Sequence, residues 1–146
     1  MKPDWILIAN ATRARLLQQD TNERVKELHS FEHPQGRSKI GDLADDRAGY
    51  EAVSSGAGSA AYQPRTDAKQ KEHQRFAREL AAFLEQQAQL GNYRRIELFA
   101  SSPFLGELKA ELGAATSRLL GDTHDLDLTM VGKAELGHRL AQEMAP

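Results

Sequence analysis

The chain contains no cysteine among its 146 residues, which excludes disulfide bonds, thiolate nucleophiles and thiolate metal sites. Long apolar runs are also missing. The N-terminal run, Trp5–Ala9, is too short for a signal peptide or a membrane-spanning helix. Neither a dinucleotide glycine fingerprint nor a Gly-x-Ser-x-Gly nucleophile turn occurs. We therefore expect a cytoplasmic protein with no membrane insertion, no bound cofactor and no self-sufficient catalytic motif.

The composition is that of one globular domain. Hydrophobic residues make up 40% of the chain and charged residues 27%, values typical of a folded rather than a disordered protein. A chain of this length buries one core, so we expect a single domain over residues 1–146. The net charge of -2 is too small to indicate a class of partner.

The N-terminal third predicts a meander of three strands. Trp5–Ala9 is continuously apolar, as in a strand buried on both faces of a sheet. Arg13–Gln18 and Arg24–Phe31 follow as two further strands, with turn residues at 20–22 between them.

Residues 34–66 lack periodicity and are punctuated by glycine and proline, which predicts a long mobile loop. Apolar residues at helical spacing then predict a long helix over 67–90, ended by Gly91.

The rest of the chain alternates strands and helices. The patterns predict a strand over 95–100, a helix from Pro103 to Leu112 with Ser102 as its N-cap, a short helix over 114–120, a half-exposed strand over 125–130 and a helix over 133–144. This order implies an α/β fold with a mixed sheet of about five strands flanked by helices.

Two local patterns suggest polar sites. The turn at Ser101 and Ser102 places helical N–H groups beyond a strand end, where an anion can bind, although capping explains the same residues. In the loop, a group of carboxylates lies among cations, which suits ion pairing and turn capping or, with His73, a magnesium site for phosphoester hydrolysis. Its residues are Asp42, Asp45 and Asp46, with Arg37, Lys39 and Arg47. The five histidines have no metal-site spacing, so we predict no metal centre.

Charge is unevenly distributed along the chain. Between residues 62 and 78, five basic residues stand against two acidic ones, whereas eight acidic residues face four basic ones from Glu97 onward. The basic residues are Arg65, Lys69, Lys71, Arg75 and Arg78. They suit contact with phosphate, and a solvated helix face is the other interpretation.

Several segments together resemble the bacterial host attachment proteins. The segments are Trp5–Leu17, His33-Pro34 with the charged loop residues, the helix at 76–84, Ser102–Leu108 and Asp125–Thr129. The resemblance covers almost the whole chain and implies a role in attachment to host cells.

That family is similar to the central domain of archaeal and eukaryotic peptide release factors and of Pelota, in which a Gly-Gly-Gln loop precedes a long helix. Here Gly56 and Gly58 occupy the corresponding place, and Gly58 stands where the glutamine would be. Gln63 follows several residues later. Because the motif is not intact, we expect no peptide release activity.

Three functions stay open from the sequence. The first is a non-catalytic module that binds the ribosome or structured RNA through the glycine loop and the basic helix. The second is an adaptor or regulator of surface adhesion that acts through protein contacts. The third is the magnesium-dependent phosphoester hydrolase.

Overall fold

The computed structural model describes residues 2–20, 24–33 and 62–145, with side chains from residue 67 onward in the last range. It contains a five-stranded sheet in the order β3-β2-β1-β4-β5. The strands are β1 (Asp4–Ala9), β2 (Arg13–Gln19), β3 (Val25–Glu32), β4 (Arg95–Ala100) and β5 (Leu120–Asp125). β1, β2 and β3 form the predicted antiparallel meander, and β1, β4 and β5 run parallel. The predicted α/β class with a mixed sheet is confirmed.

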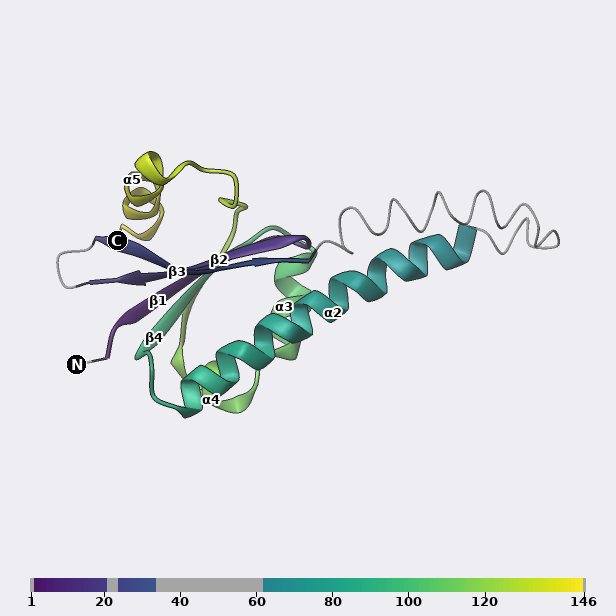
Figure 1. Cartoon of the computed structure of the whole chain (residues 1–146), viewed down its shortest axis with the longest axis horizontal. Coiled ribbons are helices and arrows are strands. Elements are labelled where there is room, and N and C mark those ends of the chain that lie inside the picture. The colour runs from purple at the N-terminus through teal and green to yellow at the C-terminus, as the bar shows by residue number, and fades with distance from the viewer. Residues whose placement is uncertain (1, 21–23, 34–61, 146) are drawn as a thin grey trace.

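Helices cover both faces of the sheet, as Figure 1 shows. On one face lie α2 (Tyr62–Gln89), α3 (Phe104–Glu111) and α4 (Ala114–Leu119), and on the other lies α5 (Lys133–Met144). This arrangement explains the unbroken apolar run of β1, because alternate side chains of a strand point to opposite faces. Leu7 packs into the core under α2, whereas Ile6 and Ile8 pack into the core under α5.

α2 is the longest helix of the described residues, and its 28 residues span about 42 Å. Its apolar stripe recurs every four residues at Phe76, Leu80 and Leu84, all at most 2% exposed. The helix ends as predicted at Gly91, which has a φ of 75°. The amides of Gly91 and Asn92 bond back to the carbonyls of Ala88 and Gln87, the pattern of a Schellman cap.

The start of α2 corrects the expected loop. Residues 62–66 are helical rather than part of the loop, so the helix begins five residues before the predicted start. Pro64 misled the prediction. It is tolerated here because first-turn amides have no acceptor within the helix.

The predicted strand over 125–130 is also wrong. The strand is β5, which ends at Asp125, and the next residues form a turn. Asp127 accepts hydrogen bonds from the amide and hydroxyl of Thr129 at 2.8 and 2.6 Å. Such local bonds compete with a strand ladder. The apolar alternation arises because Leu126 and Leu128 both pack under α5 as irregular chain.

The predicted cap of α3 is wrong by one residue. Pro103, preceded by a cis peptide bond, occupies the N-cap position, and no side chain caps the helix there. Ser102 instead donates from its amide and its hydroxyl to the carboxylate of Asp125. The short helix α4 and the terminal helix α5 lie where the sequence predicts them.

Candidate functional site

The N-terminal part of α2 extends past the end of the sheet, as Figure 1 shows. We call residues 62–71 the α2 arm, because Glu72 is the first buried side chain among those of α2 that the structure describes, from residue 67 onward. Within the arm the side chains at 67, 69, 70 and 71 are all exposed. A helical segment that buries so little of its own surface gains little stability from packing, and its surface is open to a partner.

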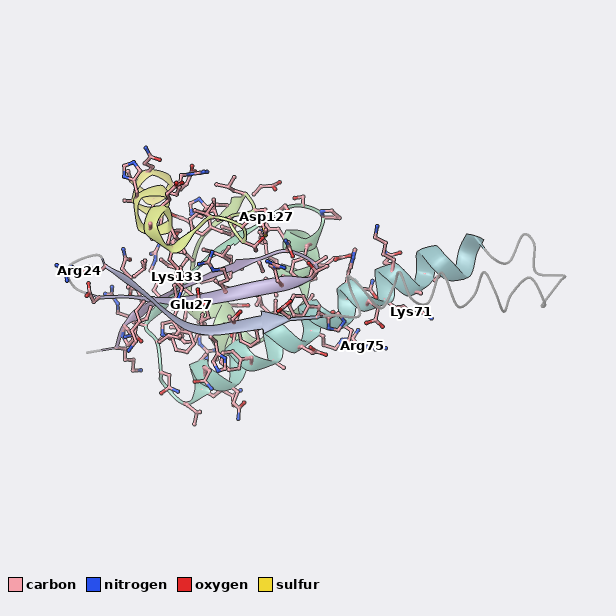
Figure 2. All side chains as sticks on the ribbon, turned by 45° about the horizontal axis from the view of Figure 1, so that its top comes forward. Arg24, Glu27, Lys71, Arg75, Asp127 and Lys133 are labelled. Atoms are coloured by element: carbon pink, nitrogen blue, oxygen red, sulfur yellow. The ribbon has the colours of Figure 1, made fainter. Side chains whose placement is uncertain are left out.

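Helical spacing divides the predicted basic residues between two sides of α2. Lys71, Arg75 and Arg78 follow one another at four and three residues, so they form one stripe on the side opposite the buried Phe76. Figure 2 shows Lys71 and Arg75 on α2, at the far end of the molecule from Arg24. Lys69 lies on the other side of the helix, one turn before His73.

The cations differ in how far their charge is already compensated. Arg75 lies 3.0 Å from the carboxylate of Glu72, and Arg78 lies 3.7 Å from that of Glu111. Among the residues that the structure describes, neither Lys69 nor Lys71 has an ion-pair partner. These two lysines therefore carry the charge that is most available to a phosphate.

β1, β4 and β5 are parallel, so all three end at the same edge of the sheet. The α2 arm extends past this edge (Figure 1). The carboxyl ends of parallel strands are where α/β proteins usually bind ligands. A pocket of about 280 Å³ opens at this edge. Side chains that line this edge pocket include Asn10, Thr12, His73, Ser101, Pro103 and Phe104.

Asn10 holds the floor of the edge pocket in place. Its carbonyl oxygen accepts bonds from the amides of Thr12 and Arg13, and its NH₂ group donates to Asp127 and Thr129, both at 3.0 Å. These bonds connect the turn after β1 to the chain after β5, although the two segments are more than a hundred residues apart in the sequence. Since all its bonds are made within the protein, Asn10 positions its neighbours rather than a ligand.

His73 is the titratable group in the wall of the pocket. Burial lowers the pKa of His73, and the nearby positive charge of Lys69 adds to this, while Glu107 opposes it. The imidazole is therefore neutral at pH 7, with one nitrogen as a donor and the other as an acceptor. Neither ring nitrogen has a hydrogen-bond partner among the described residues.

The predicted anion site at Ser101 and Ser102 is open only in part. The amide and hydroxyl of Ser102 are taken by the carboxylate of Asp125, at 3.0 and 2.7 Å. These two bonds lower the pKa of Asp125, so the carboxylate stays charged at neutral pH. An incoming anion would have to displace it. The hydroxyl of Ser101 makes no hydrogen bond within the described part of the chain.

A buried hydrogen-bonded pair beside the pocket was missed by sequence reasoning. Nε2 of His33 lies 2.7 Å from the carboxylate of Glu72, and the two residues are 6% and 8% exposed. The ring of His33 also stacks on Phe76. A signal existed, because Glu72 precedes Phe76 by four residues and so continues the buried stripe of α2 by one turn.

A second missed cluster lies on strands β4 and β5. Glu97 accepts hydrogen bonds from Arg95, the amide of Asp122 and, at 2.9 Å, the ring of His124. Burial alone would raise the pKa of Glu97, but these bonds together outweigh it and lower the pKa. His124 stacks on Phe99 at 4.1 Å. The cluster fastens the edge strand β5 to β4.

Several predicted residues lie outside the described part of the chain. They are Gly56, Gly58, Arg37, Lys39, Asp42, Asp45, Asp46 and Arg47. Gln63 and Arg65 belong to the first turns of α2, where the backbone alone is described. Within the described ranges, no three histidine or acidic side chains gather closely enough to hold a metal ion. In the same ranges, no helix is long and apolar enough to cross a membrane.

These features define a class of protein: a mixed-sheet α/β domain in which the long helix α2 extends past the carboxyl ends of the parallel strands, beside a small pocket. The family model described as "protein required for attachment to host cells" matches residues 5–140, so the chain belongs to this family. The resemblance to host attachment proteins is thus confirmed, and the similarity to release factors stays a prediction. A comparison with proteins of curated function finds no match.

Proposed function

We propose that this host attachment protein is a non-catalytic module that acts inside the cell by binding the ribosome or another structured RNA through its α2 arm. The observation that supports this most is the arm itself, an exposed helix that extends from the domain and carries Lys69 and Lys71 without ion-pair partners among the described residues. Most of the binding energy of non-specific RNA contacts comes from such cations meeting phosphates.

The charge distribution favours the approach of an RNA to the basic side of α2. The stripe of Lys71, Arg75 and Arg78 continues from the arm along the outer side of α2, whereas the chain from Glu97 onward is acidic. An RNA backbone is attracted to the first region and repelled by the second. Glu72, whose carboxylate lies 3.0 Å from Arg75, also bonds His33 in the interior.

The salt dependence of binding to a structured RNA tests the proposal. If three or four cations engage phosphates, the logarithm of the association constant falls with the logarithm of salt concentration at a slope of about -2 to -3. The double variant K69Q/K71Q should reduce the steepness of this slope by about 1.4, since each lost phosphate contact removes about 0.7.

A matched control separates local contact from net charge. Lys26 on β3 and Lys133 on α5 are also exposed lysines, so K26Q/K133Q changes the net charge equally away from the arm. It should bind RNA like the wild type. Equal losses in the two double variants, or binding that ignores salt, would rule out the arm as the RNA contact.

The alternative is an adaptor that regulates adhesion through protein contacts alone, which the family description also supports. It predicts that attachment to host cells depends on the protein, while RNA binding is absent. The magnesium-dependent hydrolase is the third proposal. Its predicted ligands Asp42, Asp45 and Asp46 lie outside the described residues. Magnesium at 100 times its dissociation constant should then stabilise the protein by about 2.7 kcal/mol.

A further inference from the structure

We propose that the edge pocket receives one unpaired nucleobase of the bound RNA, while Lys69, one helical turn before His73 on α2, holds a phosphate outside it. This inference rests on the proposed RNA-binding function and adds to it the kind of RNA that is recognised: a strand with at least one unstacked base. A base turned out of its stack is the part of RNA that proteins most often read by its edge.

The size of the pocket suits a single planar group. Its 280 Å³ lies just below the range of 300–1,000 Å³ typical of sites for drug-sized ligands. Pro103, Phe104 and Ala11 supply apolar surface, and His73 supplies an aromatic ring. Aromatic and apolar walls are what a base requires once it has left its neighbours.

The free polar groups of the pocket suit the edge of a base. The ring nitrogens of His73 and the hydroxyl of Ser101 have no hydrogen-bond partner among the described residues. A neutral imidazole offers one donor and one acceptor, and a hydroxyl offers both. Base edges present the same mixture of donors and acceptors.

The electrostatics argue against a phosphate in the same place. Among the described residues no lysine or arginine lines the pocket, His73 is neutral at pH 7, and the charged Asp125 holds Ser102 at the rim. Lys69 lies outside the pocket, one helical turn before His73. Lys69 is thus placed to contact the phosphate backbone of an RNA strand, and the pocket is placed to receive a base of that strand.

The test compares a short single-stranded RNA with an abasic strand that keeps every ribose and phosphate. The wild-type protein should bind the RNA about tenfold more tightly, within the range that one stacked base contributes. H73F keeps the ring but removes both nitrogens, and S101L fills the pocket. S101L should reduce the affinity for RNA to that for the abasic strand, whereas H73F, which keeps the stacking ring, should lose the part of the preference that depends on the ring nitrogens. H138F, which changes an exposed histidine on α5, should keep the tenfold preference.

The outcomes separate this inference from the proposed function. Equal affinity of the wild type for the two strands overturns the base pocket and leaves RNA binding by the arm intact. An undiminished preference in both H73F and S101L, with melting temperatures near that of the wild type, also overturns it. Failure to bind either strand overturns the proposed function together with the inference.

Discussion

Removing His33 from its buried hydrogen bond with Glu72 should lower the stability of the fold. Leaving a buried polar group without its hydrogen-bond partner typically costs about 1–3 kcal/mol, and more when that group is charged. In H33A the Glu72 carboxylate keeps Arg75 at 3.0 Å, so we expect a loss of about 2–3 kcal/mol in the free energy of unfolding. For a domain with 5–15 kcal/mol of total stability this is a large fraction.

The coupling between the two residues is the quantity that isolates their contact. H33A, E72A and the double variant form a cycle, for which we expect a coupling energy of at least about 1.5 kcal/mol. The measurement is urea unfolding at pH 7, followed by the fluorescence of Trp5. This single tryptophan is 5% exposed and stacks on Tyr93, so it reports on loss of the core.

An exposed ion pair provides the control. Arg94 bonds the carboxylate of Asp4 at 2.9 Å through two nitrogens, with the arginine side chain 61% exposed. Surface pairs contribute about 1 kcal/mol or less, so the cycle of R94A and D4A should give a lower coupling energy. If the His33–Glu72 coupling were no larger than this, the argument that burial makes the pair important would be refuted.

Two further predictions concern α2 and its neighbours. G91A should lower the free energy of unfolding in urea by about 1–2 kcal/mol, because Gly91 has a φ of 75°. At Gly106 a Cβ meets nothing within 4 Å, so G106A should cost no stability. Equal costs of the two substitutions would contradict this account of the helix end. Hydrogen bonds from the amide of Thr116, then from Gln89, lower the pKa of Glu85 to about 2 from its ordinary 4.5. Its folded pKa is depressed, so its contribution to stability is complete above pH 4.5 and is lost as the pH falls toward 2. In E85Q the melting temperature should therefore fall less steeply across this window, and an unchanged slope would contradict the role of Glu85 in holding α4.

The sequence predicts those elements whose patterns arise from local chemistry. α5 follows the expected bounds because its apolar residues recur at helical spacing, and Leu136 and Leu140 are buried as that spacing requires. The meander of β1, β2 and β3 follows from short apolar runs separated by turn residues.

The missed features depend on contacts between distant parts of the chain. β5, with the sequence Leu-Gly-Asp-Thr-His-Asp, has little apolar pattern, and it is paired with β4 through the cluster at Glu97. The bonds of Asn10 to Asp127 and Thr129, and of His33 to Glu72, link residues whose proximity is set only by the sheet order. The spacing of apolar residues along the chain does not indicate which distant residues will form such pairs.

The candidate site was predicted in part for the same reason. The basic residues of α2 were identified from composition, but their division between two sides of the helix follows from the direction in which Phe76 is buried. The edge pocket combines His73 of α2 with Ser101 after β4 and Asn10 after β1. The parallel pairing of β1 with β4 brings Asn10 and Ser101 together, and the packing of α2 on the sheet adds His73.

The most direct test of the proposed function is co-sedimentation of the protein with ribosomes from its own cells, at low and at moderate salt. The account predicts that the wild type sediments with ribosomes at low salt and less at moderate salt, and that K69Q/K71Q stays in the supernatant while K26Q/K133Q sediments like the wild type. Absence of the wild-type protein from the ribosome fraction at low salt would contradict the account and would favour the protein-binding adaptor.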